Sequence, residues 1–292
     1  MAFDRNALRM RRTRSFIDRG ARMLWIAALA VVLGWSATRP AVAVEPADPW
    51  PDLARDIFDG RQLADGVGLI AIDMPNRAED AAIVPVTLRV TLPADDARSV
   101  RTITLVIDQN PAPVAAIFQV GAKVTMISTR VRIDSYTNVH AVADLSDGNL
   151  YVATTFVKAS GGCSAPTAKN AEEAKANLGQ MRFRQFAQPT PASKPAAPAS
   201  APREAQVMIR HPNNSGLQRD QVTLLYIPAF FVRDIRIWQG DELMLAMDGG
   251  ISMSEDPNIR FNYRPNGATQ FRVEAVDTDG HVFRSEWPVE AM

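Results

Sequence analysis

The sequence predicts an all-β protein made of two small antiparallel β-sandwich domains, and three observations support this fold class. Short runs carry apolar residues at every second position, which is the period of a half-buried strand. Turn dipeptides such as Asp147-Gly148 and Asn266-Gly267 separate these runs. A stretch rich in proline, alanine and serine, residues 187–204, divides the runs into two groups and is predicted to be an interdomain linker.

The first domain is predicted over residues 44–186 and begins with a short amphipathic helix over residues 50–60. Six or seven strands follow between residues 67 and 158, as is typical of a β-sandwich. In the clearest strand, Val86, Leu88 and Val90 face one side and polar residues face the other. Further strands are predicted over residues 102–108, 123–133, 136–145 and 150–159, and a helix with a capping box over residues 170–184.

The second domain is predicted over residues 205–292 and reads as a second sandwich of seven short strands. Its turns are explicit, because each supplies glycine next to asparagine or aspartate. The strands are predicted over residues 205–211, 222–227, 230–238, 242–248, 259–264, 269–277 and 281–289.

Residues 1–43 have the three parts of a secretory signal peptide. Seven arginines precede the apolar run 23–35, which is too short to span a bilayer, and Ala41 and Ala43 give the small-x-small ending. We therefore expect cleavage after Ala43, a periplasmic location and no membrane span in the mature chain. An uncleaved anchor is the alternative, and Arg39 argues against it by ending the apolar run early. The export route, Sec or twin-arginine, stays open.

Charge and motif content exclude several classes of function. The leader holds eight of the 32 basic and two of the 32 acidic residues, so the mature chain carries a net charge of −6, which argues against nucleic-acid binding. His140, His211 and His281 are scattered without metal-ligand spacing, and no phosphate loop or hydrolase elbow is present. We expect His140 and His281 to be exposed and His211 to belong to a turn. The sequence thus predicts no catalytic residue, metal or cofactor.

Cys163 is the one residue that points to chemistry, because it is the only cysteine in 292 residues. Gly161 and Gly162 precede it and Pro166 follows, so this segment is predicted to be a mobile arm with an exposed thiol. An exposed site also predicts that Cys163→Ser leaves stability unchanged. A thiol without a partner cysteine suits a carrier that is loaded and unloaded by other proteins; an incidental exposed cysteine is the alternative.

The chain resembles a fusion of the SoxY and SoxZ sulfur-carrier subunits, in the variant associated with quinoprotein dehydrogenases. The SoxY-like part is carried by "SVRTITLVIDQNPAPVAAIFQV" and "NLYVATTFVKASGGC", and the SoxZ-like part by "DGGISMSEDPNIRFNYRP" and "EAVDTDGHVFRSEWP". This resemblance implies two Ig-like sandwiches packed on each other, and a cysteine that holds the sulfur substrate covalently during thiosulfate oxidation. Cys163, Gly161 and Gly162 match the carrier arm, whereas the usual trailing glycines are replaced by "SAP".

The sequence therefore predicts a non-catalytic periplasmic carrier that binds a sulfur compound on Cys163. Its expected partners are sulfur-oxidation or quinoprotein dehydrogenase components, with the second sandwich as a built-in partner. One alternative is a binding accessory of a periplasmic quinoprotein (PQQ) dehydrogenase, in which protein contact is the function. Another is a thiol oxidoreductase, which a second nearby cysteine would have favoured.

Overall fold

The structure is a computed structural model that describes residues 48–93, 95–166, 171–186 and 202–290. All described helices and strands lie in one compact unit, Pro49–Met292. The predicted signal peptide, including Ala43, and most of the predicted linker lie outside the described residues. Within the described ranges, no helix is long and apolar enough to cross a membrane.

Nearly all regular structure is β-strand, which confirms the predicted all-β class. We call β1–β8 the N-terminal half and β9–β15 the C-terminal half. The N-terminal half contains α2 (Trp50–Ile57), β1 (Leu63–Asp65), β2 (Ile70–Asp73), β3 (Val84–Val90), β4 (Val100–Ile107), β5 (Val114–Val120), β6 (Met126–Val131), β7 (Thr137–Leu145) and β8 (Leu150–Val157). After α3 (Ala171–Ala176), the C-terminal half contains β9 (Met181–Phe186), β10 (Arg203–Ile209), β11 (Val232–Gln239), β12 (Glu242–Gly249), β13 (Asn258–Tyr263), β14 (Gln270–Asp277) and β15 (Val282–Pro288).

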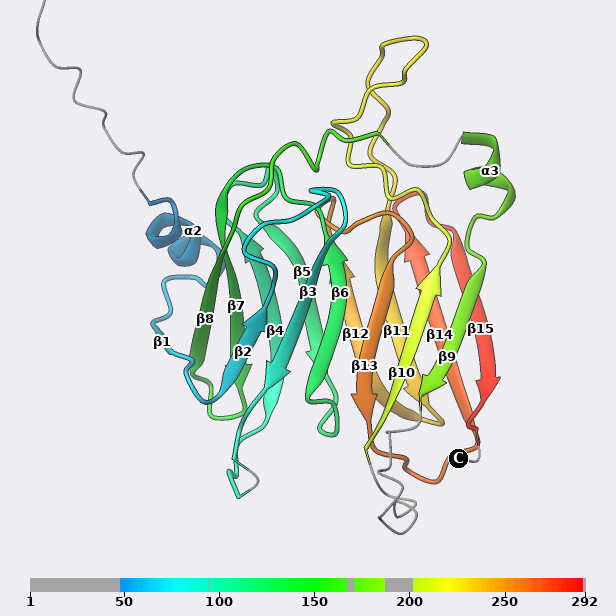
Figure 1. Cartoon of the computed structure of the whole chain (residues 1–292). Helices are drawn as coiled ribbons and strands as arrows, with labels where there is room; N and C mark the ends of the chain where they lie inside the picture. The colour runs from blue at the N-terminus through cyan, green and yellow to red at the C-terminus, as the bar shows by residue number, and fades with distance from the viewer. Residues whose placement is uncertain (1–47, 94, 167–170, 187–201, 291–292) are drawn as a thin grey trace, which may run out of the picture. The chain divides into compact units, whose positions relative to one another are not determined.

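Two sheets form the layers of the sandwich, and both sheets run through both halves (Figure 1). The larger sheet has the order β1-β8-β7-β4-β5-β12-β11-β14-β15, and the smaller sheet has the order β2-β3-β6-β13-β10-β9. Every neighbouring pair is antiparallel except β1 with β8. The halves therefore meet edge to edge in each layer.

Backbone pairing at the junction replaces the face-to-face packing that the resemblance implied. β5 pairs with β12 from Ala116 to Val120, and β6 pairs with β13 through Ile127 and Ser128. A Cβ on Gly121 would lie 2.7 Å from the Met244 carbonyl oxygen, so glycine is needed for this approach. Pairing also covers edge strands that two separate sandwiches would leave open.

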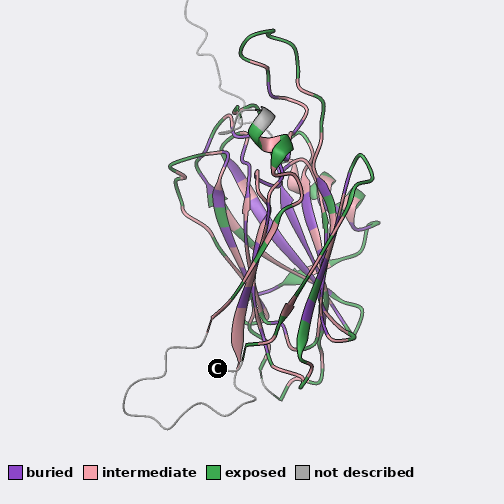
Figure 2. Cartoon of the chain, turned by 90° about the vertical axis from the view of Figure 1, so that its right-hand side faces the viewer, coloured by how far each residue is buried: buried purple, intermediate pink, exposed green. Residues whose placement is uncertain are grey.

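One apolar core lies between the two sheets and continues across both halves. The predicted alternation explains it, since Val84, Val86 and Leu88 of β3 are buried, as are Phe271 and Val273 of β14. Viewed from the side, buried segments line the space between the layers (Figure 2). A smaller cluster forms where α2 packs on the outer face of the larger sheet.

The segment predicted to be an interdomain linker instead connects two neighbouring strands of one sheet. β9, which precedes residues 187–201, pairs antiparallel with β10, which follows them, and Phe186 lies opposite Glu204. The chain therefore crosses between the halves earlier, between β8 and β9. That crossing contains Cys163.

Two element predictions differ from the structure. The predicted helix over residues 170–184 ends within α3, and Met181 begins a strand instead. Gly179 explains the change, because its φ of +73° ends helical geometry and a Cβ there would clash with the Phe283 ring. The predicted strand over residues 222–227 is not a strand, and its apolar side chains are exposed.

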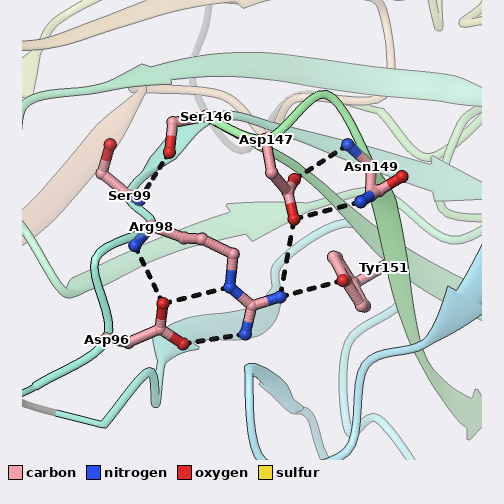
Figure 3. A network of polar contacts seen from close by, with 7 residues as sticks. All are labelled: Asp96, Arg98, Ser99, Ser146, Asp147, Asn149 and Tyr151. Carbon is pink, nitrogen blue, oxygen red and sulfur yellow. Dashed lines mark hydrogen bonds and ion pairs between the residues drawn. The ribbon is translucent and has the colours of Figure 1, made fainter.

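A polar network fixes the end of the sandwich opposite to Cys163 (Figure 3). Arg98 donates two hydrogen bonds to the Asp96 carboxylate and lies 3.6 Å from Asp147. Asp147 accepts a 2.9 Å hydrogen bond from the Asn149 amide and so closes the predicted Asp-Gly hairpin turn. The Arg98 hydrogen bonds lower the pKa of Asp96 to about 2, because they stabilise the ionised carboxylate.

Cutting the chain between β9 and β10 should not separate the two resulting fragments. We expect the fragments of a protein with a protease site inserted within residues 187–201 to co-elute in size-exclusion chromatography at micromolar concentration. The reason is that β9 stays with the N-terminal fragment while it pairs with β10 over six residues, in addition to the β5–β12 and β6–β13 pairs. Separate elution without denaturant would contradict this prediction.

Candidate functional site

Cys163 lies on the crossing between the halves, shortly after β8. We call residues 160–165 the cysteine segment. Its backbone is fixed to the N-terminal half, because the Gly161 amide donates to the Asp134 carbonyl over 2.8 Å and the Gly162 amide to the Ile133 carbonyl over 2.9 Å. The Cys163 side chain is fully buried.

Gly161 and Gly162 allow the backbone of the cysteine segment to lie close to neighbouring backbone. Gly161 has a φ of +78°, which favours glycine. A Cβ on Gly162 would lie 2.0 Å from the Ala81 carbonyl oxygen and 2.7 Å from the Ile133 carbonyl oxygen. Only glycine therefore allows the segment to approach these backbones. The role of Gly161 and Gly162 in arm flexibility stays a prediction.

The C-terminal half covers the segment with residues 211–218, which we call the clamp loop. The Ser215 hydroxyl donates to the Cys163 carbonyl, and the Gln218 side-chain amide donates to the Ala165 carbonyl over 3.1 Å. The Gln218 side-chain carbonyl oxygen in turn accepts the Ser215 amide over 3.0 Å. The two clamp residues therefore orient each other and hold main-chain atoms of the segment.

Arg132 links the two halves beneath the cysteine segment. Its guanidinium donates to the Gly162 carbonyl and to the Asn213 carbonyl, each over 3.3 Å. The side chain is buried, and this burial lowers its pKa. Arg132 is thus a buried cation that joins the cysteine segment to the clamp loop.

Burial makes the Cys163 thiol a poor nucleophile. It raises the pKa of Cys163 to about 12, Asp134 adds to the rise, and Arg132 opposes it only in part. Since the thiolate is the nucleophile, the held segment keeps Cys163 in its unreactive form at neutral pH.

The prediction of an exposed thiol is therefore wrong, because Cys163 is buried, whereas the mobility of the segment stays a prediction. Glycine and proline exclude helix and strand, but the segment is held by hydrogen bonds from both halves. Because the side chain is buried, Cys163→Ser is no longer expected to leave the stability unchanged. A hydroxyl in this buried site without a partner should cost about 1 to 3 kcal/mol.

His140 is buried although it was predicted to be exposed, and His211, predicted only to belong to a turn, is buried as well. His140 is covered by Trp50, whose ring stacks on it at 3.6 Å, and its nitrogens contact Asp108 and Thr154. His211 lies in the clamp loop, where its Nδ1 accepts the Asn213 amide over 3.1 Å and burial lowers its pKa. His281 is exposed, as predicted. Among the described residues, no group of three or more potential ligands could hold a metal ion.

Sequence reasoning missed the residues that hold Cys163: Arg132, Asn213, Ser215 and Gln218. The stretch "RHPNNSGLQ" showed only turn chemistry, and nothing local in it indicates that it contacts a segment about 50 residues earlier.

Comparisons with known proteins fit this two-part construction. The family described as "Sulfur oxidation protein SoxY" matches residues 54–163, so its match ends at Cys163. The family described as "Sulphur oxidation protein SoxZ" matches residues 193–288. No curated protein matched the chain.

Solved structures gave several matches of low overall similarity. The sulfur carrier protein SoxY from Chlorobium limicola f thiosulfatophilum is 26% identical, with a TM-score of 0.33, covering 38% of this chain and 91% of that chain. A superoxide reductase (neelaredoxin) from Ignicoccus hospitalis is 19% identical, with a TM-score of 0.26, covering 31% and 79%. A putative superoxide reductase from Thermotoga maritima is 14% identical, with a TM-score of 0.26, covering 35% and 96%.

The fold and the family matches agree on a β-sandwich protein built from two parts. The chain carries a region that matches the SoxY family, followed by a region that matches the SoxZ family.

Proposed function

We propose that this chain is a non-catalytic periplasmic carrier that holds a sulfur compound covalently on Cys163. One observation carries the proposal: the only cysteine of the chain stands at the end of the SoxY match and is held by the SoxZ domain. A carrier thiol needs a protected position between loading and unloading. The clamp loop provides one within the same chain.

Loading requires the cysteine segment to leave the clamp, because the buried thiol is protonated and inaccessible. Release breaks the hydrogen bonds from Ser215 and Gln218 and exposes the thiol to solvent, where its pKa returns towards its usual value. Both contacts go to main-chain carbonyls, so they hold the backbone of the segment and do not engage the thiol itself. Held and released positions would then correspond to protected and exchanging forms.

Thiosulfate is the substrate that the SoxY and SoxZ resemblance implies. Joining a thiol to thiosulfate forms one sulfur–sulfur bond and releases one proton and two electrons. The carrier has no described group that could accept these electrons, so the proposal requires an electron-accepting partner protein in the periplasm. Within this chain, the role of Cys163 is attachment.

Intact-mass spectrometry of the protein isolated from its own periplasm tests this proposal. We expect a chain beginning at Val44 with a sulfur-containing mass increment that disappears on mild reduction. Cys163→Ala should lack the increment while keeping the fold, since alanine leaves the site apolar. An unmodified thiol would contradict the carrier function, and a chain beginning at Met1 would contradict the predicted signal cleavage.

The burial of Cys163 specifically favours a second candidate function. In a binding accessory of a periplasmic quinoprotein dehydrogenase, protein contact is the function and a buried thiol needs no access. Native protein without an adduct, together with unchanged dehydrogenase activity in a Cys163→Ala strain, would support the accessory function over the carrier function.

A further inference from the structure

The stretch predicted to be a strand over residues 222–227 belongs to a projecting loop. We call residues 219–226 the apolar tip. Four large apolar side chains in it are exposed: Val222 at 88%, Leu224 at 67%, Leu225 at 69% and Tyr226 at 60%. Figure 1 shows the loop in yellow, projecting beyond the ends of the strands on the side where the chain crosses from β8 to α3. An exposed apolar cluster of this kind marks an interaction site.

The apolar side chains of the tip are exposed although the backbone of the tip has a defined local structure. The Asp220 carboxylate accepts three hydrogen bonds, from the Val222 amide and from the amide and hydroxyl of Thr223, at 2.7 to 3.1 Å. The Arg219 guanidinium lies 4.7 Å from the centre of the Tyr226 ring and donates to its hydroxyl. The tip is therefore held in one shape, which reduces the ordering entropy that binding would cost.

The apolar tip continues directly from the clamp loop. The side chain of Gln218 donates a hydrogen bond to the Ala165 carbonyl. The main-chain carbonyl of Gln218 accepts a 2.9 Å hydrogen bond from the Ile227 amide, which closes the base of the tip. A protein bound to the tip would thus lie next to the cysteine segment. It would also contact the loop whose movement releases that segment.

The charges around the tip favour a protein partner over a lipid surface. Membrane-inserting loops and helices combine apolar residues with surrounding lysine and arginine. Here the flanking charges are Arg219 and Asp220, which cancel, and Arg219 is engaged by Tyr226. Leucine and tyrosine on a rigid projection suit an apolar recess of a protein, where a few buried side chains supply most of the binding energy.

We propose that the apolar tip docks into an apolar recess of the electron-accepting protein that loads sulfur onto Cys163. The inference rests on the proposed carrier function. It adds the surface by which the loading protein recognises the SoxZ domain and reaches the clamp.

The test measures loading of purified full-length mature protein by a periplasmic extract of its own cells, with thiosulfate as the substrate and intact mass at Cys163 as the readout. We expect Val222→Asp/Leu225→Asp to load at least about tenfold more slowly than wild type, equivalent to about 1.4 kcal/mol in the loading step. Val67→Asp is the matched control, since Val67 is 84% exposed and lies outside the tip, and it should load at the wild-type rate. Both variants should react with a small alkylating reagent like wild type.

Each outcome decides the inference. Wild-type loading of the double variant would show that the tip is not the docking surface while the carrier function stands. Equal slowing in Val67→Asp would also overturn the inference. Failure of wild type to load would contradict the carrier function, and the inference would fall with it. Binding of wild type, but not the double variant, to phosphatidylglycerol vesicles would assign the tip to a membrane instead.

Discussion

Iodoacetamide should alkylate Cys163 in the folded protein on the order of 10³-fold more slowly at about pH 7 than in the unfolded protein. Burial raises the pKa of this thiol from 9.0 to about 12, so the thiolate is correspondingly rarer in the folded state. The rate in the unfolded chain should level off above pH 9, whereas the rate in the folded protein should continue to rise. Mass spectrometry can follow the reaction at one site, because no other cysteine is present.

The sign of this shift also fixes a stability effect. The unfolded thiol ionises above pH 9 while the folded thiol does not, so the contribution of the protonated thiol to stability is complete below pH 9 and declines as pH rises towards 12. Cys163→Ala should lack this part of the alkaline decline. Equal alkylation rates in folded and unfolded protein at neutral pH would contradict a cysteine segment held by hydrogen bonds. They would instead support the predicted mobile arm.

Gly162→Ala should release the cysteine segment and raise the alkylation rate of folded protein by at least about 100-fold, because the thiolate fraction then recovers. The added methyl group would lie 2.0 Å from a backbone oxygen of Ala81, and backbone cannot move aside as a flexible side chain can. The strands and core should persist, since no strand contains residues 158–163. Circular dichroism of the variant checks that the fold is retained.

Gly148→Ala is the matched control for this variant. Gly148 has a φ of +83° in the hairpin turn at the other end of the sandwich, and no atom lies within 4 Å of a Cβ there. We expect a stability loss of about 1 to 2 kcal/mol from backbone strain and an alkylation rate like that of wild type. An unchanged rate in Gly162→Ala, with the fold retained, would show that this glycine does not control the position of the segment.

Local patterns in the sequence were sufficient for the strands whose partners impose a buried face. The alternation of Phe271, Val273 and Ala275 places β14 because a two-residue period has one structural meaning when one face is buried. The same reasoning failed for residues 222–227. Their apolar residues suit a strand, but Asp220 satisfies the backbone locally and no sheet edge accepts them.

By itself the sequence determined the all-β class, most of the strands, the hairpin at Asp147-Gly148 and the position of the only cysteine, Cys163. Each of these depends on residues that are neighbours in the chain or on a count. Only the tertiary structure decided that the halves join through their sheet edges, that the predicted linker closes a strand pair, and that Cys163 is buried. These features depend on contacts between residues that are distant in the sequence, such as Gly162 with Ala81 and Ser215 with Cys163. The presence of a glycine or a serine in the sequence does not indicate which distant residue it will contact.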